Sequence, residues 1–412
     1  MAARVAVVDP YSSGALLAPA FAKHGRESVV VQSRGEAPEL FRSSFTPDDF
    51  VAIVNGETGA IRTASELERL DIRHVLAGSE PGVELADELC ERLGLAANGR
   101  AQRAARSDKY LMGEAVRSRG LRAPAQFQSP HLDELRRWVR SHATWPVVVK
   151  PPRSVASDSV TVCRTEAELG RAHEAIAGRT NVLGQLNESV LVQEFLDGPE
   201  YVVDTVSHEG RHRVAALWRY HRAPCDRAAV FYDAMELLPY HGERQEALVE
   251  YAIGVLNALE IRYGPAHTEL IWAGDGPILV ETGARLSAGN NAVLSRLCGG
   301  PCALDLVVEA CVDPERFLAA PAPRNLTGTA MNCFLIPPRG QRLTARPPLD
   351  AIRDLASFHR ISVAQPPRRH PVVGVVTLVH NDRRVVHDDL ERLRELERTT
   401  FYQPVGAALD GG

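Results

Sequence analysis

The first hundred residues alternate short apolar runs with longer amphipathic ones. Runs rich in β-branched residues predict four strands: Arg4–Asp9, Ser28–Ser33, Phe50–Asn55 and His74–Ser79. Helical stretches lie between them, for example Leu16–His24 and Gly82–Leu93. Strands that alternate with helices of this length pack as a parallel sheet covered on both faces. The sequence therefore predicts an α/β first domain over residues 1–105.

The pattern changes after Ser107, where helices and strands no longer alternate regularly. The next part predicts helices Asp108–Arg119, Leu132–His142 and Glu166–Ile176 and strands Val147–Lys150, Val160–Cys163 and Val190–Leu196. The loop Pro151–Ser159, made of small and polar residues, joins the first two of these strands. We expect an α+β unit over residues 106–190.

Two long hairpins dominate the third part, which we place at residues 191–325. One is Tyr201–Tyr220 with its turn at His208-Glu209-Gly210, and the other is His267–Thr282 with its turn at Gly274-Asp275-Gly276-Pro277. Helix Glu243–Leu259 lies between them. Residues 326–412 are rich in proline and arginine and predict a small C-terminal subdomain, with a strand at Val372–His380 and a last helix at Asp388–Arg398.

The second hairpin carries the strongest chemical signal. Glu269 and Glu281 are placed symmetrically about Asp275. A symmetric hairpin therefore sets the two carboxylates opposite each other, with Leu270 and Trp272 against Val280 and Ile278 on the other face. Facing carboxylates repel unless a cation lies between them, and Mg²⁺ commonly binds one or two carboxylates. The alternatives are glutamates that face water, or a register slipped by one residue.

Cations flank this hairpin in the sequence. Arg285 follows Glu281 closely and could stabilise a developing oxyanion, or it could be a surface arginine on a turn. Lys150 ends an apolar strand before a small-residue loop, and Lys109 opens a helix, where a cation opposes the helix dipole. Both lysines suit contact with phosphate. Extended backbone near Gln193-Glu194-Phe195-Leu196 suits an adenine edge, and Glu200 suits ribose hydroxyls.

Taken in order along the chain, these features resemble the ATP-grasp ligases. The resemblance covers nearly the whole chain and implies a Rossmann-like pre-ATP-grasp domain, two α+β ATP-grasp subdomains and a small C-terminal subdomain. Its cofactors would be ATP and Mg²⁺. It implies that Lys109, Lys150, Ser154 and Ser157 contact phosphates, that Glu194, Phe195, Leu196 and Glu200 hold adenosine, that Glu269 and Glu281 bind the metal, and that Arg285 is catalytic.

Glu-x-Gly-Ala-Arg at residues 281–285 is most similar to the branch of L-amino acid ligases. Two departures from the family stand out. Many members have Asn, a further metal ligand, where this chain has Gly283. The phosphate loop is usually glycine-rich, but Pro151–Ser159 contains no glycine, and Ala156 and Ser159 stand where glycines are expected. Positive φ angles there would be costly, so we expect an altered, stiffer loop.

The resemblance implies a carboxylate–amine ligase that forms an amide through an acyl phosphate and releases ADP and phosphate. For the substrates we expect contacts from Glu80, Arg222, His267 and Gly289, although His267 could also be a core histidine bonded to the backbone. The alternatives are a carboxylase of the same superfamily that uses bicarbonate, and a non-catalytic ATP-binding module.

Composition narrows the class of partner. The net charge is -5 and no polybasic stretch occurs, so nucleic acid is not an expected partner. The first apolar run is too short for a signal peptide, and no window approaches about 18 uninterrupted apolar residues, so we expect no membrane span. The seven cysteines contain no CxxC and fit free thiols in the cytoplasm. Homodimers are common in the family.

Overall fold

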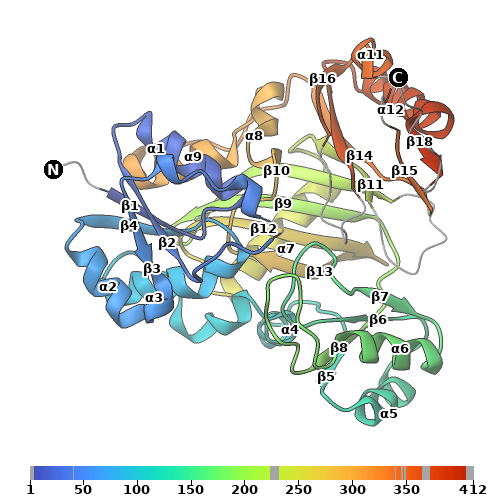
Figure 1. Ribbon diagram of the computed structural model, residues 1–412, viewed down its shortest axis with the longest axis horizontal. Helices are drawn as coiled ribbons and strands as arrows, with labels where there is room; N and C mark the ends of the chain where they lie inside the picture. Colours follow the sequence, from blue (N-terminus) through green and yellow to red (C-terminus); the bar gives the residue numbers. More distant parts are fainter. Residues whose placement is uncertain are drawn as a thin grey trace.

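The chain folds around three main sheets, seen in a computed structural model (Figure 1). The structure describes residues 4–39, 41–222, 232–338, 340–344, 347, 349–363 and 372–404. In the described part, a four-stranded parallel sheet, a four-stranded antiparallel sheet and an eight-stranded sheet follow one another along the chain. A two-stranded sheet of β15 (Gln341–Leu343) and β18 (Tyr402–Pro404) lies near the C-terminus.

The N-terminal unit is the parallel sheet that the sequence predicts. Its order is β3-β2-β1-β4, from β1 (Arg4–Val8), β2 (Ser28–Gln32), β3 (Ala52–Asn55) and β4 (Ile72–Ala77). Helices α2 (Ala60–Glu68) and α3 (Val83–Arg92) cover the face that carries Ala6 and Val8. The other face packs on α1 (Leu17–Ala22) and on the distant helix α9 (Ala303–Val312). Both faces are thus buried, as in other parallel sheets.

The small unit follows helix α4 (Lys109–Ser118) and has the strand order β5-β8-β6-β7. The strands are β5 (Gln126–Ser129), β6 (Val147–Lys150), β7 (Thr161–Cys163) and β8 (Val190–Glu194), all paired antiparallel. Helices α5 (Leu132–His142) and α6 (Glu166–Ile176) cover one face with a shared apolar core. Val148 and Val162 of this sheet line a cleft instead.

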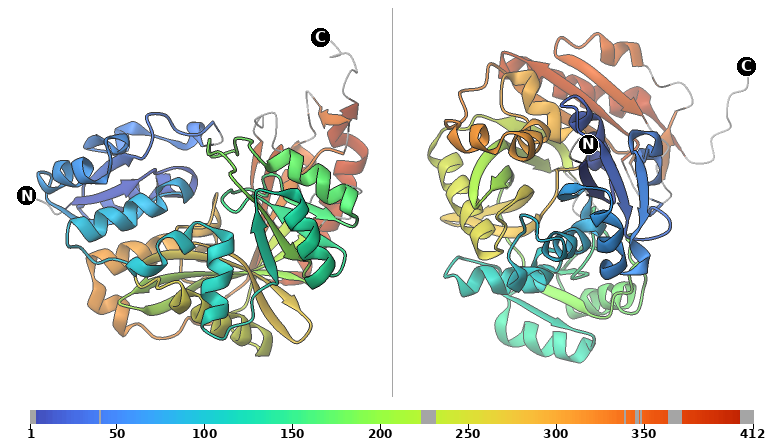
Figure 2. Two further views of the ribbon diagram at one scale, coloured as in Figure 1. Left: turned by 90° about the horizontal axis from the view of Figure 1, so that it is seen from below. Right: turned by 90° about the vertical axis from the view of Figure 1, so that its left-hand side faces the viewer.

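The large sheet has the order β13-β12-β9-β10-β11-β14-β17-β16 and runs through the middle of the molecule (Figure 2). Its strands are β9 (Glu200–His208), β10 (Arg211–Arg222), β11 (Tyr232–Leu238), β12 (Gly264–Ala273), β13 (Gly276–Gly283), β14 (Thr329–Leu335), β16 (Phe358–Val363) and β17 (Gly374–His380). Helix α7 (Glu243–Ala258) packs on the β9, β12 and β13 half.

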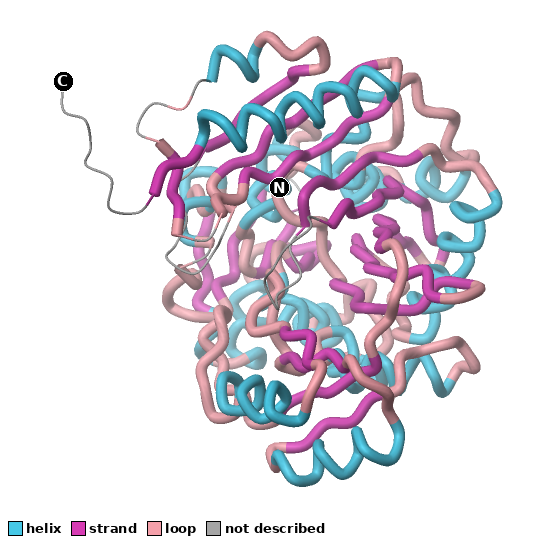
Figure 3. Tube along the Cα trace, turned by 90° about the vertical axis from the view of Figure 1, so that its right-hand side faces the viewer, coloured by secondary structure: helices cyan, strands magenta, loops and turns pink. Residues whose placement is uncertain are grey.

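The C-terminal segment extends this large sheet. β14 pairs with β11, so the predicted division between residues 325 and 326 is crossed by continuous strand pairing. Helix α12 (Arg383–Leu396) lies across β14 and β17 and closes a separate apolar core (Figure 3). The other short α-helices after β13 are α8 (Asn291–Leu294), α10 (Pro314–Ala319) and α11 (Leu349–Arg353). The four domain ranges stay a prediction.

Two sequence predictions about local structure were wrong. The last helix begins at Arg383, not at Asp388, because the Asp382 side chain accepts from the Arg384 N–H and caps the helix there. The second hairpin turns through two residues, so Leu270 faces Leu279 and Trp272 faces Pro277. An irregularity between Glu269 and Leu270 then restores the predicted pairing of the two glutamates.

The cysteines of the described chain are all free thiols, and Cys225 lies outside the described residues. Within the described chain, no single helix is long and apolar enough to span a membrane. The segments Asn291–Cys298 and Ala303–Val312 reach that length and composition only as a pair, and a 99° bend separates them.

The buried side chain of Arg106 joins the N-terminal unit to the large unit. Its guanidinium lies 2.7 Å from Asp87, and it donates to the Leu259 carbonyl at 2.8 Å and to the Gly99 carbonyl at 2.9 Å. Arg106 is 0% exposed. A buried charge with this many partners becomes very costly for the remaining groups when it is removed.

We expect Arg106→Met to lower the free energy of unfolding by about 3 kcal/mol, because Asp87 and two carbonyls lose their donor inside the protein. Urea or thermal unfolding followed by circular dichroism measures the change. Arg100→Met is the matched control, since the Arg100 side chain is 81% exposed beside Glu91 and its loss should cost under about 1 kcal/mol. Equal stability of the two variants would contradict this role for Arg106.

Candidate active site

One cleft of about 380 Å³ lies where the three units meet. Its lining includes fourteen of the residues predicted from sequence: Glu80, Lys109, Lys150, Ser154, Ser157, Glu194, Phe195, Leu196, Glu200, Arg222, His267, Glu269, Glu281 and Arg285. Gly289 is exposed and outside this lining, although its neighbour Ala288 belongs to it. The fold therefore brings together residues that are up to about two hundred positions apart.

The two lysines lie at the centre of the cleft. Lys109 donates to the Ser154 carbonyl at 2.7 Å and forms an ion pair with Glu281 at 2.8 Å. Burial opposes its charge, but the carboxylate of Glu281 raises the pKa of Lys109. Lys150 is 5% exposed, and burial, followed by repulsion from Lys109, lowers its pKa to about 8. A pair of cations in a dry site is poised for an anionic ligand.

Glu269 and Glu281 are paired directly across β12 and β13. Burial alone would raise the pKa of Glu281, but Lys109 and then Lys150 hold it below its usual value. Across the described chain, no group of three or more His, Cys, Asp or Glu side chains is arranged to hold a metal. Two carboxylates on one face nevertheless fit Mg²⁺, which takes its other oxygens from phosphate and water.

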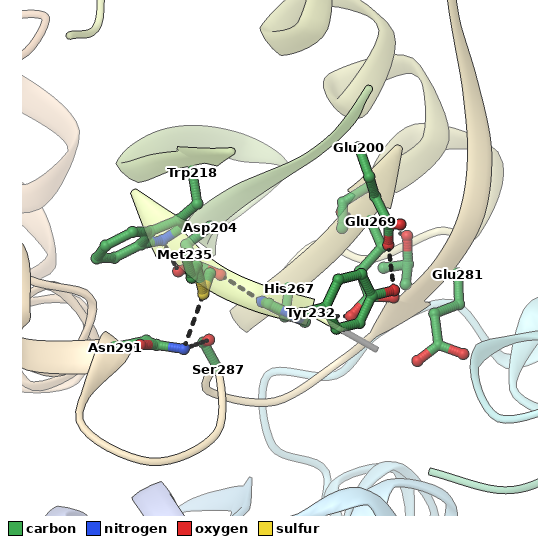
Figure 4. A network of polar contacts seen from close by, with 12 residues as sticks. Glu200, Asp204, Trp218, Tyr232, Met235, His267, Glu269, Glu281, Ser287 and Asn291 are labelled. Atoms are coloured by element: carbon green, nitrogen blue, oxygen red, sulfur yellow. Dashed lines mark hydrogen bonds and ion pairs between the residues drawn. The ribbon is translucent and has the colours of Figure 1, made fainter. Parts of the chain in front are cut away.

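Glu200 begins β9 and is buried against two partners. Its carboxylate accepts from the Tyr232 hydroxyl at 2.7 Å (Figure 4). It also accepts from Arg222 at 3.2 Å. Burial, reinforced by repulsion from Glu269, raises the pKa of Glu200 to about 7. Arg222, predicted to hold a substrate carboxylate, therefore lies beside the residue predicted to hold ribose.

The end of β8 forms the apolar wall of the cleft. β8 ends at Glu194, and Phe195 and Leu196 follow it along the lining. Val148 and Val162 of the small unit and Ile271 and Leu279 of the large unit complete this wall. A slot between two apolar layers, with backbone polar groups at one edge, suits a flat heterocycle.

His267 lies in a buried chain of polar contacts (Figure 4). Its Nδ1 is 2.7 Å from Asp204, whose other oxygen accepts from the Trp218 indole at 2.8 Å, and its Nε2 is 3.2 Å from Glu269. Burial alone would lower the pKa of His267, but Asp204 and then Glu269 raise it to about 9. The side chain of His267 is thus bonded to carboxylates rather than to the backbone, and these carboxylates favour its charged form.

At the other end of the cleft, Arg285 meets Glu80 of the N-terminal unit at 3.2 Å. Burial raises the pKa of Glu80, and Arg285 opposes that shift. A Cβ on Gly283 would lie 3.0 Å from the Glu80 carboxylate and 3.1 Å from the Arg285 guanidinium. The position where many ATP-grasp members have Asn is therefore filled by this ion pair. Gly289 meets the cleft only indirectly, through its N–H bond to Ser12.

Sequence reasoning missed several residues of the site. Asp204 is a buried polar contact of His267, Tyr232 is a partly buried contact of Glu200, and Asp158 lines the cleft beside Ser157. Asp204 is an acid that follows the apolar run Tyr201–Val203, which is a visible signal. Its pairing with His267 depends on the β9–β12 register, which the sequence alone does not show.

We expect the stabilising effect of His267 to depend on pH. Its folded pKa of about 9 lies above the ordinary value of 6.5, so the added stability is complete below about pH 6.5 and disappears as pH rises through about 9. The melting temperatures of wild type and His267→Gln should therefore differ most near pH 6.5 and converge by about pH 10. A difference that stays constant over this range would contradict a charged His267.

Comparisons with known proteins agree with this geometry. An ATP-grasp domain model matches residues 143–293. The chain is 33% identical over 321 residues to dapdiamide A synthase of Enterobacter agglomerans, covering 76% of this chain and 74% of that protein.

Two solved structures share the fold over nearly their whole length. An L-amino acid ligase from Bacillus licheniformis has a TM-score of 0.73 at 18% identity and covers 98% of this chain and 99% of its own. A carboxyaminoimidazole ribonucleotide synthase of Aspergillus clavatus, complexed with ATP, has a TM-score of 0.69 at 14% identity, with 96% and 98% covered. They confirm the predicted ATP-grasp fold with its Rossmann-like N-terminal unit. Given the match to dapdiamide A synthase, the chain belongs to the ATP-grasp ligase family.

Proposed function

We propose that this protein uses ATP and Mg²⁺ to join the carboxylate of one amino acid to the amino group of a second amino acid. The reaction passes through an acyl phosphate and releases ADP and phosphate. The observation that carries the proposal is the pairing of Glu269 with Glu281 beside Lys109, Lys150 and Arg285 in one cleft. The similarity to dapdiamide A synthase, whose name describes a synthetic enzyme, supports it.

ATP fits the cleft with its adenine in the apolar slot beside Phe195 and Leu196, and with its ribose near Glu200. Its phosphates then reach Lys109 and Lys150, where buried positive charge compensates them. Glu269 and Glu281 would hold Mg²⁺, which would neutralise charge at the phosphates during phosphoryl transfer. Lys109 holds the Glu281 carboxylate at 2.8 Å on the same side of the cleft.

In the first step, an oxygen of the substrate carboxylate attacks the γ-phosphorus of ATP and the bond to the β-phosphate oxygen breaks. ADP leaves and an acyl phosphate remains. The protein contributes mainly position and positive charge, since phosphoryl transfer needs little else from side chains. Glu80 contributes a carboxylate to the acceptor end of the cleft, where it can bind the amino group of the first substrate.

In the second step, the amine nitrogen attacks the carbonyl carbon and forms the amide bond. The carbon–oxygen bond to phosphate breaks, inorganic phosphate leaves, and the nitrogen loses a proton to solvent or phosphate. Arg285 stabilises the oxyanion of the tetrahedral intermediate. His267, charged and anchored by Asp204, fixes Glu269 from the side.

The decisive experiment is phosphate release from ATP with Mg²⁺, measured over pools of the twenty L-amino acids and then over pairs. We expect release that requires specific substrates, with a product mass equal to their sum less water. A substrate labelled with ¹⁸O in its carboxylate should transfer one label to phosphate, which reports the acyl phosphate. Release that needs bicarbonate in place of an amino acid carboxylate would point to a carboxylase.

Glu281→Gln should lower kcat at least about a hundredfold, because one metal-binding carboxylate is lost. Glu250→Gln, an exposed glutamate on α7, is the matched control and should leave kcat unchanged. Steady-state phosphate release measures both. Full activity of Glu281→Gln would sink the proposed metal site.

The pH dependence of kcat/KM for ATP should reflect the titration of Lys150. Because its pKa is about 8 and the charged form binds phosphate, kcat/KM for ATP should fall as pH rises above about 8. Lys150→Arg keeps its charge at higher pH, so this decline should disappear even where the overall rate is lower. The same decline in both proteins would assign it to another group.

A further inference from the structure

The phosphate loop of this chain has an unusual backbone. The residues between β6 and β7 include no glycine, yet Ala156, Ser157 and Ser159 have φ angles of 56°, 54° and 57°. These angles lie in the left-handed region, which disfavours an L residue by roughly tenfold each relative to glycine. Something other than intrinsic preference must hold three such residues within four positions.

Asp158 is the residue that ties this backbone down. Its Oδ2 accepts from the Ser154 hydroxyl at 2.8 Å and from the Val182 N–H at 3.1 Å. Its Oδ1 accepts from the Ser159 hydroxyl at 3.1 Å. One carboxylate thus links both sides of the turn to a second loop of the small unit.

The second loop, which contains residues 181–183, and the start of the phosphate loop are themselves held by further contacts. The Asn181 amide donates to the Arg153 carbonyl at 2.7 Å, and Arg34 of the N-terminal unit donates to the Leu183 carbonyl at 2.7 Å. Arg153 forms an ion pair with Glu84 at 2.9 Å. The carboxylate of Asp158 therefore connects the loop to a fixed frame.

The conformation of this loop leaves some of its backbone N–H groups available to bind a ligand. The N–H of Asp158 donates to the Val155 carbonyl and that of Val160 to the Ser157 carbonyl. Among the described residues, none accepts a hydrogen bond from the N–H of Ala156, Ser157 or Ser159. Successive backbone N–H groups in a turn of this kind form an anion-binding concavity. Ala156 and Ser157 line the cleft beside Lys150.

We propose that Asp158 is a positioning residue that takes the place of the missing glycines. It holds the left-handed residues through Ser154, Ser159 and Val182, and so sets the N–H groups of Ala156 and Ser157 in place for the β- and γ-phosphates of ATP. The inference rests on the proposed ATP site and concerns only how its loop is held. In a glycine-rich loop the same angles carry little penalty, so no such anchor is required.

The test is a double-mutant cycle between Asp158→Ala and the paired substitution Ala156→Gly/Ser159→Gly. Calorimetry measures the Kd of AMP-PNP and of AMP with Mg²⁺ for all four proteins. In the natural loop, Asp158→Ala should weaken AMP-PNP binding about tenfold and leave AMP binding within about twofold. In the glycine-containing loop, the same substitution should weaken AMP-PNP binding by less than about threefold, because the anchor is no longer required.

AMP binding shows that each variant is folded, and Asp133→Ala, at an exposed aspartate of α5, is the control that should change neither Kd. An equal effect of Asp158→Ala in both loops would overturn the inference and indicate a simple charge effect. Equal weakening of AMP and AMP-PNP would overturn it in favour of general damage to the small unit. Wild-type protein that binds neither nucleotide would overturn the proposed function itself.

Discussion

The site depends on holding two like charges, Glu269 and Glu281, opposite each other across one hairpin. Such a pair is unfavourable unless cations compensate it. In this structure the compensation comes from both sides, with Lys109 at 2.8 Å from Glu281 and His267 at 3.2 Å from Glu269. Lys109 comes from the segment that leads into the small unit, while His267 is anchored by Asp204 inside the large sheet. The two carboxylates therefore also connect the segment that leads into the small unit with the large sheet.

Most helices and strands of the fold could be predicted from the sequence, because their hydrophobic residues repeat with the spacing typical of each element. The central parallel strands β1 and β2 are buried on both faces and contain the apolar runs Val5–Val8 and Val29–Val31. The facing of Glu269 and Glu281 was correct, although the assumed symmetric turn was wrong. A two-residue turn and an irregularity before Leu270 compensate each other. The sequence contains both residues but not the way in which the strand adjusts its register.

The contacts between distant strands could not be predicted in this way. Asp204 and His267 are 63 positions apart, and Glu200 and Tyr232 are 32 positions apart. Only the neighbour order of the large sheet brings each pair together, and strand order is set by packing rather than by local propensity. For the same reason, the continuity of β11 with β14 was not visible, since a proline-rich segment looks like a boundary whether or not the sheet crosses it.

The two departures from the family pattern have a common physical form. At Gly283 the missing side chain leaves room that Glu80 and Arg285 fill from two separate units, and a Cβ there would approach the Glu80 carboxylate to 3.0 Å. In the phosphate loop the missing glycines are replaced by a carboxylate that fixes the backbone. In each case the residue type that the family pattern has at one position is absent, and a contact between segments distant in the sequence takes its place. The site is then more dependent on how the units are held together, because a loss of that arrangement removes the acceptor-end ion pair as well as the anchor of the loop.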